Sequence, residues 1–157
     1  ELDFVLLAEP SARGLGAVDL LTVFPGGLYV VAHHTHRLFA QESVTMAEIK
    51  DETFMLWDPL ELPYLSAATL SAFRAHGIEP KVASYGKKLG DMIAFATLKE
   101  GLGVTTCAAS AAGNSVTRIL PISDCRTGFD IKLARAKNNE NPAALTFFEY
   151  IRLNSGQ

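Results

Sequence analysis

Cysteine is scarce in this chain, and its scarcity argues against a disulfide scaffold. Cys107 and Cys125 are the two cysteines among 157 residues, too few to cross-link a chain of this size. Cys107 ends an apolar segment, which is typical of a small buried side chain. A bridge between the two is compatible with the sequence, but the composition favours a reducing compartment, and we expect a cytoplasmic protein.

Long hydrophobic runs and an excess of basic charge are also missing. No run approaches the roughly 18 apolar residues that span a bilayer, and the chain opens on Glu1, Leu2 and Asp3 rather than on the basic region of a signal peptide. The formal net charge is −3, whereas a surface that holds nucleic-acid phosphates needs a basic excess. We expect no membrane partner and no direct DNA contact. Because the sequence begins on a predicted strand and not on Met, we expect it to be a piece of a longer chain.

The usual signatures of catalysis and cofactor binding are absent. The Gly14-x-Gly16 pair lacks the third glycine of a dinucleotide-binding fingerprint, and no P-loop, H-E-x-x-H or EF-hand pattern occurs. Ser66 and Ser110 lie outside any G-x-S-x-G context, and Cys107 has no histidine partner that the sequence identifies. We therefore expect no enzyme activity and no cofactor.

Three histidines in four residues, His33, His34 and His36, raise the hypothesis of a zinc site. Neighbouring residues of an extended segment point to opposite faces, so His33 and His34 would not converge on one ion. No cysteine or further histidine sits at ligand spacing. The sequence favours hydrogen-bonding histidines and no metal.

What the chain does contain is an alternation of short apolar segments with helical segments. Strands are expected at residues 54–57, 81–85 and 104–107, and helices at residues 66–76 and 89–99. This alternation indicates βαβ units and a parallel sheet. Ligands of such sheets bind outside the carboxyl ends of the strands, so the sequence predicts one rim at which these three strands stop.

The flanking segments complete the expected fold. Residues 2–8 read as an interior strand, residues 129–134 as a half-buried strand at an edge, and Thr45 with Glu48 as a capping box. Further strands are expected at residues 18–24, 28–32 and 116–122, and a last helix at residues 143–153. The apolar faces of the helices are expected to carry Leu65, Ala68, Ala72 and Phe73 in the first, Leu89, Ile93, Ala96 and Leu98 in the second, and Leu145, Phe148 and Ile151 in the last.

At the rim, binding is favoured over catalysis. Helix N-termini at residues 65–66 and 87–89 would aim free backbone N–H groups there, which suits a carboxylate or another anion. Lys87 or its neighbour would add a countercharge, and Trp57, Tyr64 and Tyr85 would supply flat apolar walls. The alternative is ordinary: the aromatic residues belong to the core and the lysines to a solvated face.

The order of the elements and the amino-acid sequences of several of them resemble those of the effector-binding domain of LysR-type transcriptional regulators. Five fragments in the same order and spacing carry the resemblance: LYVVA at 28–32 followed by HRL at 36–38, VTMAEI at 44–49, FMLWDP at 54–59, AHGIEP at 75–80 and KEGLGV at 99–104. The sequence departs from the family at Arg37, where proline is usual, and at Cys107 and Ala108, where Leu-Pro is usual.

The resemblance implies an α/β fold of the type II periplasmic-binding-protein kind, with two Rossmann-like lobes, parallel-type sheets and two crossover strands. Lobe I would comprise residues 1–24 and 125–157 and would be incomplete, because its first strand and helix are not in the sequence. Lobe II would comprise residues 25–124. An effector, an anionic metabolite by the reasoning above, would lie between the lobes. The expected effector contacts are Trp57, Asp58, Tyr64, Ser66, Tyr85, Gly86, Lys87, Thr106 and Cys107 in lobe II, with Glu9 and Ser11 in lobe I.

Such regulators form homodimers or homotetramers, and the helix at residues 66–75 would pack against a partner chain. They bind DNA through an N-terminal winged helix-turn-helix, which this sequence does not contain. The alternative with the same fold is a solute-binding lobe of a transport system, and a remoter one is an enzyme domain.

Overall fold

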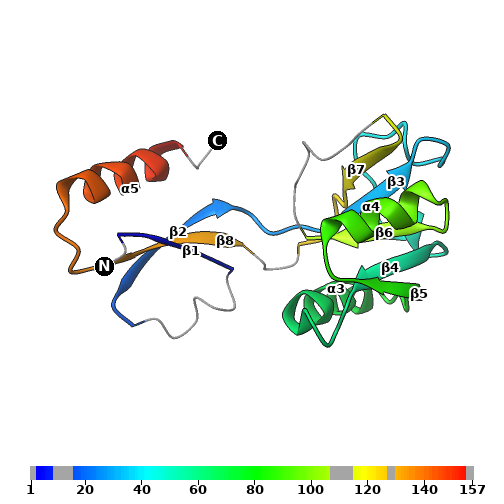
Figure 1. Cartoon of the computed structure of the whole chain (residues 1–157), viewed down its shortest axis with the longest axis horizontal. Coiled ribbons are helices and arrows are strands. Elements are labelled where there is room, and N and C mark those ends of the chain that lie inside the picture. Colours follow the sequence, from blue (N-terminus) through cyan, green and yellow to red (C-terminus); the bar gives the residue numbers. More distant parts are fainter. Residues whose placement is uncertain (1–2, 9–15, 107–114, 127–129, 155–157) are drawn as a thin grey trace. The chain divides into compact units, whose positions relative to one another are not determined.

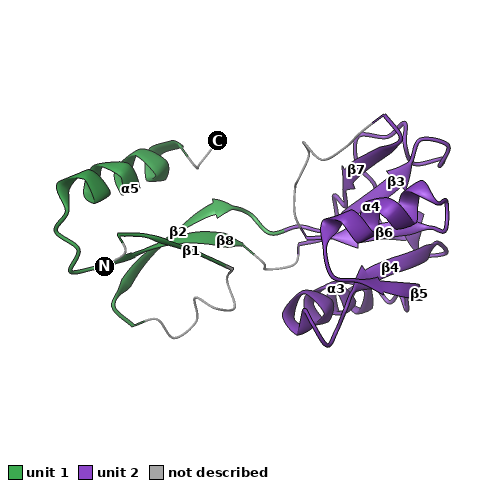
Figure 2. Ribbon diagram, viewed as in Figure 1, with its two compact units in different colours: residues 1–26, 128–157 green, residues 27–127 purple. Residues whose placement is uncertain are grey.

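The chain folds into two compact units. The computed structural model describes residues 3–8, 16–106, 115–126 and 130–154. Unit 1 consists of Glu1–Gly26 and Gly128–Gln157, and unit 2 of Gly27–Thr127 (Figure 2). The chain therefore passes between the units twice, after Gly26 and after Thr127.

Unit 2 contains a five-stranded sheet in the order β5-β4-β6-β3-β7 (Figure 1). The parallel arrangement expected for the three strands of the βαβ units is confirmed, because β4 is parallel to both β5 and β6. The sheet is nevertheless mixed, since β3 runs antiparallel to β6 and β7. The strands are β3 (Tyr29–His33), β4 (Thr53–Trp57), β5 (Lys81–Gly86), β6 (Leu102–Thr105) and β7 (Thr117–Pro121).

The helices in the described part of unit 2 are α2 (Met46–Ile49), α3 (Pro63–Ala75) and α4 (Leu89–Thr97). The expected capping box of α2 is present, with the Thr45 side chain accepting from the Glu48 N–H and the Glu48 carboxylate accepting from the Thr45 N–H at 2.8 Å. Helix α3 begins three residues before the expected start, because proline fits the first position of a helix, where no N–H is needed.

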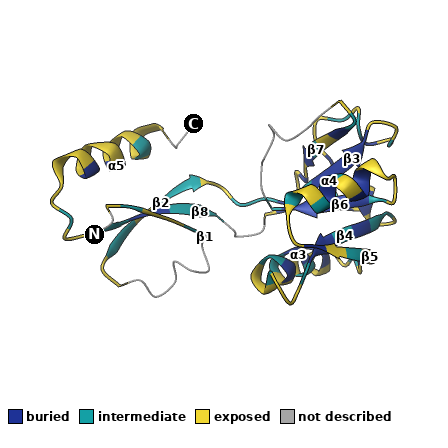
Figure 3. Cartoon of the chain, viewed as in Figure 1, coloured by how far each residue is buried: buried dark blue, intermediate teal, exposed yellow. Residues whose placement is uncertain are grey.

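Each face of the sheet has its own helical cover. The larger core cluster joins α2 and α3 to side chains such as Val30 and Phe54, and the second joins Val31 and Trp57 to Met92 and Ala96 of α4. Neighbouring strand residues thus serve opposite faces, as the period of two requires. The buried residues of unit 2 concentrate in these layers (Figure 3). Leu98, expected on the apolar face of α4, is 69% exposed because α4 ends before it.

Two glycines allow β6 to approach its neighbours closely. A Cβ on Gly103 would lie 2.7 Å from Cβ and 2.8 Å from the carbonyl oxygen of Met92 in α4. Gly101 has a φ of +153° and leaves room for the carbonyl oxygen of Thr53, which would lie 2.2 Å from an added Cβ. The Gly-Leu-Gly element therefore sets how tightly helix and sheet pack.

Unit 1 contains a three-stranded antiparallel sheet of β1 (Val5–Ala8), β8 (Ile131–Ala136) and β2 (Val18–Phe24) in the order β1-β8-β2. Two expectations were wrong here. The strand expected at an edge, β8, is central, and β1, expected in the interior, lies at an edge of the described sheet with Leu6 61% exposed. Apolar runs indicate burial, but which strands pair is decided by contacts distant in sequence.

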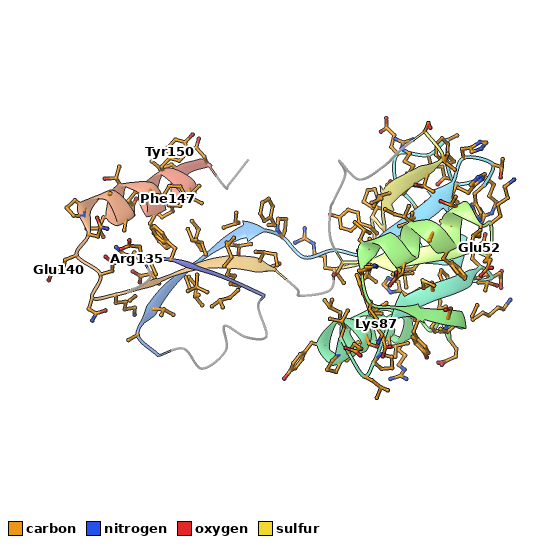
Figure 4. All side chains as sticks on the ribbon, in the orientation of Figure 1. Glu52, Lys87, Arg135, Glu140, Phe147 and Tyr150 are labelled. Carbon is orange, nitrogen blue, oxygen red and sulfur yellow. The ribbon has the colours of Figure 1, made fainter. Side chains whose placement is uncertain are left out.

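The last helix, α5 (Pro142–Asn154), contacts β8 and the residue just before β1 through aromatic side chains. Phe147 meets Phe4 edge-to-face with ring centroids 5.2 Å apart. Arg135 lies over the ring of Phe148 and pairs with Asp19 of β2. Phe147 and Arg135 are labelled in Figure 4. The buried face of α5 is formed by Ala144 and Phe148. Leu145, expected on that face, is 40% exposed.

Candidate functional site

The carboxyl ends of the parallel strands meet at one edge of the sheet in unit 2. Trp57 at the end of β4 is paired in register with Gly86 at the end of β5. Thr105, the last residue of β6, lies opposite Tyr29, the first residue of β3. The rim predicted from the sequence is therefore present, and it carries Trp57, Gly86 and Thr105 in one row.

Both connections to unit 1 leave from this same edge. β3 begins at Tyr29 directly after the first crossing, and Tyr29 is in register with Pro121, the last residue of β7. The backbone N–H of Ile122 donates to the carbonyl of Leu28 at 2.8 Å, so the two connecting segments start side by side. The rim is consequently the part of unit 2 next to which the chain enters and leaves.

Asp58 organises the loop after β4. Its backbone N–H donates to the carbonyl of Gly86 at 3.0 Å, which ties the ends of β4 and β5 together. Its carboxylate accepts the N–H groups of Leu60 at 2.8 Å and Glu61 at 3.3 Å. The Asp58 carboxylate, expected to contact an effector, thus holds the turn that leads into α3.

The N-terminus of α3 has no side-chain cap. Leu62 occupies the N-cap position without a side-chain hydrogen bond, and Pro63 at the first helical position has no N–H. The N–H of Ser66 already donates to the carbonyl of Leu62 at 3.0 Å, and Ser66 is 2% exposed. The first-turn donors are therefore the N–H groups of Tyr64 and Leu65, one residue earlier than predicted. The Tyr64 side chain is 71% exposed.

The N-terminus of α4, by contrast, is occupied by its own carboxylate. Oδ2 of Asp91 accepts the backbone N–H groups of Lys87 at 2.8 Å and Lys88 at 3.2 Å. The hydrogen bond from Lys87 is the main cause that holds the pKa of Asp91 below its usual value. Two of the donors that were predicted to face a ligand at residues 87–89 are consequently used within the protein.

An ion pair between Lys87 and Glu61 links the residues that precede α4 and α3. The Lys87 Nζ lies 2.8 Å from Oε1 of Glu61, and both side chains are more than half exposed (Lys87 is labelled in Figure 4). The hydrogen bond to Glu61 and the charge of Glu61 raise the pKa of Lys87. An exposed pair of this kind contributes little to stability and is readily exchanged for another partner.

Trp57 is a core residue whose indole nitrogen has no hydrogen-bond partner among the described residues. Its side chain is 6% exposed and packs in the cluster of Val31, Met92 and Ala96. Within the described part of the chain, its indole N–H is buried and has no hydrogen-bond acceptor. A buried unpaired donor is uncommon in folded proteins and calls for an explanation such as a water or a ligand.

The remaining predicted residues differ in exposure. Tyr85 is 51% exposed, whereas Gly86 is buried, with an added Cβ 3.1 Å from Sδ of Met55. Thr106, directly after β6, is half-buried. Cys107, Glu9 and Ser11 lie outside the described residues.

Sequence reasoning missed Glu61 and the capping role of Asp91. An acidic residue at the third position of a helix is a known capping signal, so Asp91 was detectable. Glu61 was not, because it meets Lys87 only when the loop after β4 and the end of β5 come together.

Several other features bear on alternative sites. Among the described residues, no group of three His, Cys, Asp or Glu side chains is placed to hold a metal ion. Nδ1 of His33 lies 2.8 Å from Oγ1 of Thr35, and Cys125 is a buried free thiol. An open hollow of about 460 Å³ in unit 1 is lined by Phe4, Leu6, Val23, Phe24, Leu133, Phe147 and Ile151. These lining side chains are all apolar and offer nothing to orient a polar ligand.

In the part of the chain that the structure covers, no helix is long and apolar enough to cross a bilayer.

The chain crosses twice between two units, and the parallel strands of unit 2 end at one rim. This arrangement belongs to the type II periplasmic-binding-protein class of folds. The chain belongs to the LysR substrate binding domain family, whose model matches residues 1–155. Domains of this family serve transcription regulators and are not enzymes in general. Comparison with curated protein sequences gives no match.

Solved structures of the family share this fold. The effector-binding domain of QuiR in complex with shikimate aligns with a TM-score of 0.64 at 19% identity over 98% of this chain and 71% of that one. The BenM effector-binding domain with benzoate gives 0.73 at 18% identity, over 98% and 69%. The regulatory domain of Synechocystis PCC6803 CcmR in complex with 2-PG gives 0.70 at 16% identity, over 99% and 74%. The chain spans about half the length of full-length BenM.

Proposed function

We propose that this chain is the sensing part of a LysR-type transcription regulator and that it binds a small anionic metabolite at the rim of unit 2. Unit 2 would be lobe II, and unit 1 would belong to lobe I. The whole regulator would be a cytoplasmic homodimer or homotetramer that contacts DNA through a winged helix-turn-helix outside this chain. Effector binding would change how the oligomer presents those DNA-binding ends.

The uncapped N-terminus of α3 is the observation that carries this proposal. Its free N–H groups and the positive end of the helix dipole favour a carboxylate or phosphate. It lies in the row of strand ends from which both connections leave. The α4 N-terminus is already neutralised by Asp91, so the α3 side is the better anion site.

Two further groups support an anionic ligand at this place. Lys87 is held at the same rim by an exposed ion pair that a ligand carboxylate can replace. The indole N–H of Trp57 lacks an acceptor among the described residues. Shikimate and benzoate, bound by the solved domains of QuiR and BenM, are both carboxylates at neutral pH.

A thermal-shift series tests the proposal. Shikimate, benzoate and other small carboxylates are compared with uncharged counterparts such as benzamide. A ligand that binds the folded state alone raises the melting temperature. We expect at least one carboxylate to raise it while its uncharged counterpart does not. Equal responses to both, or none across the series, would contradict an anion site.

Two lysine variants place the site. Lys87→Gln should weaken the response to carboxylates several-fold, because it removes the countercharge. The matched control is Lys81→Gln, at the opposite end of β5, where Nζ donates to the carbonyl of Asp51. If both variants respond alike, the ligand does not bind at this rim.

A solute-binding lobe of a transport system shares this fold, but the family assignment favours the regulator. The coding sequence that precedes Glu1 distinguishes them: a winged helix supports the regulator, and an export signal supports the transporter.

A further inference from the structure

The second connection between the units is anchored at its base by three elements of unit 2. The N–H of Ile122 donates to Leu28 at 2.8 Å, and the N–H of Ser123 donates to the carbonyl of Val44 at 2.8 Å. Asp124 accepts the N–H of Met46, the first residue of α2, at 2.9 Å. These bonds hold residues 122–124 just before the chain leaves for unit 1.

His76 adds a contact from α3 to the same segment. It follows the last residue of α3, and its Nδ1 lies 2.9 Å from the carbonyl oxygen of Ala72 within that helix. Its Nε2 lies 3.2 Å from the carbonyl oxygen of Asp124, and 4.0 Å from Oδ2 of the Asp124 carboxylate. One imidazole ring thus bridges the C-terminal end of α3 and the connecting segment.

The number of hydrogen bonds that this bridge can form depends on whether the imidazole is neutral or protonated. Both ring nitrogens face carbonyl oxygens, and carbonyl oxygens only accept hydrogen bonds. A neutral imidazole carries a single N–H, so it satisfies one of the two contacts and turns a lone pair toward the other oxygen. The imidazolium donates to both carbonyls at once and is also attracted to the Asp124 carboxylate.

The charged and titratable groups near the ring come from the connecting segment and from α3. On the connecting segment, Asp124 supplies the carboxylate nearest to the ring. Cys125, beside it, stays neutral, because burial and then the charge of Asp124 raise the pKa of its thiol. On the helix itself, Arg74 lies in the last turn. The ring side chain is 30% exposed, so protons reach it from solvent.

We propose that His76 is a proton-operated latch that fastens the second connecting segment to the C-terminal end of α3. Protonation closes the latch by letting the ring donate to both carbonyls at once, and deprotonation leaves a single N–H for the two of them. The latch acts on residues 122–124, which belong to unit 2 and precede the second crossing. The latch does not require a bound effector, so it can be tested independently of the proposed ligand site.

Amide hydrogen exchange of the whole chain tests the latch. The Ser123 amide donates to the carbonyl of Val44 and the Cys125 amide to that of Ile122, so the exchange of both reports local opening of the segment. After correction for the intrinsic pH dependence of exchange, we expect their protection to rise about three- to tenfold between pH 8 and pH 5.5, the effect of one charge-assisted bond that is partly solvated. Protection that does not change with pH would overturn the proposal.

Variants separate the latch from general effects of pH. His76→Asn retains a donor near the Ala72 carbonyl but cannot reach Asp124 or take up a proton, so the pH dependence should disappear. The matched control, His34→Asn, alters an exposed histidine elsewhere in unit 2 and should leave it intact. If His76→Asn keeps the pH dependence, the latch is wrong.

A measurement on the unaltered chain covers the case in which His76→Asn fails to fold. ¹⁵N chemical shifts of the His76 ring distinguish imidazolium from either neutral tautomer. The protection of Ser123 and Cys125 should follow the appearance of the imidazolium along the same titration curve. Two curves with clearly different midpoints would overturn the proposal.

Discussion

Nζ of Lys87 lies 2.8 Å from Oε1 of Glu61, and this ion pair connects a residue just before α4 to the loop after β4. The two residues are 26 positions apart in the sequence. An anionic ligand at the rim must take Lys87 from Glu61 and must also tolerate the Glu61 carboxylate nearby. Glu61 therefore competes with the ligand that we propose.

Glu61→Gln should raise the affinity for carboxylates about two- to fivefold. The substitution frees Lys87 and removes a like charge, and both effects favour a bound anion. Isothermal titration with the most strongly stabilising carboxylate of the thermal-shift series measures the change. Glu79→Gln, an exposed carboxylate just before β5, is the control and should leave affinity unchanged. Weaker binding by Glu61→Gln would show that Glu61 assists the ligand.

The orphan indole N–H of Trp57 predicts an unusual pair of substitutions. Trp57→Phe keeps an aromatic ring in the cluster and removes a donor that has no acceptor within the described fold. The free energy of unfolding should therefore change by no more than about 1 kcal/mol. Trp57→Ala empties the site and should cost about 3–5 kcal/mol.

Urea denaturation followed by circular dichroism measures both variants. If the N–H serves a ligand, Trp57→Phe should also reduce the carboxylate-induced thermal shift while leaving the unliganded protein as stable as before. A loss above about 2 kcal/mol for Trp57→Phe would mean that the indole has a structural acceptor.

Much of unit 2 could be predicted from local patterns. The box formed by Thr45 and Glu48 depends on residues three apart, and the parallel strands on runs of apolar residues between helices. In unit 1, the bounds of β2 at Val18–Phe24 also agree with the prediction. Such features are encoded within a few residues, so the sequence shows them directly.

What failed depended on contacts distant in sequence. The central place of β8 between β1 and β2 is set by pairing across more than a hundred residues, such as Leu6 with Leu133. The burial of Trp57 comes from α4, and the pairing of Lys87 from a loop before α3. Residue types at the rim could be predicted, but which of their polar atoms remain free for a ligand could not.

Gly103 and Gly90 predict opposite effects of the same substitution. A Cβ on Gly103 meets both side-chain and backbone atoms of Met92 below 3.0 Å, so helix α4 would have to shift. Gly103→Ala should cost about 2–3 kcal/mol. Gly90, within α4, has only Cε of Lys88 at 4.0 Å from an added Cβ. Gly90→Ala should therefore stabilise by about 0.5–1 kcal/mol through helix propensity.

The fluorescence of Trp57, the one tryptophan of the chain, reports the unfolding of unit 2 in urea for both glycine variants. The opposite signs form an internal control, because both changes add one methyl group to a glycine next to or within α4. Equal effects would show that the close approach of β6 to α4 does not limit stability.

Asp91 predicts how the stability of unit 2 changes in acid. Hydrogen bonds from the Lys87 and Lys88 N–H groups hold the pKa of Asp91 below its usual value of 3.8. A carboxyl whose pKa is lower in the folded state stabilises that state fully above the unfolded-state pKa. The contribution is lost as pH falls through the folded-state value, because the unfolded chain then binds the proton more readily. Asp91→Asn does not titrate, so its stability should lie below that of the unaltered protein at pH 6 and approach it as pH falls below about 4.

Urea denaturation at pH 6, 4 and 2.5, followed by Trp57 fluorescence, measures the two curves. Asp51→Asn removes another carboxylate of unit 2, one that is exposed, and serves as the control. Some acid sensitivity should persist in Asp91→Asn, because hydrogen bonds to Thr45 also lower the pKa of Glu48. Adding Glu48→Gln should flatten the curve further. A gap between the unaltered protein and Asp91→Asn that stays constant from pH 6 to pH 2.5 would mean that the Asp91 charge does not stabilise α4, and the α4 N-terminus would then be as open to an anion as that of α3.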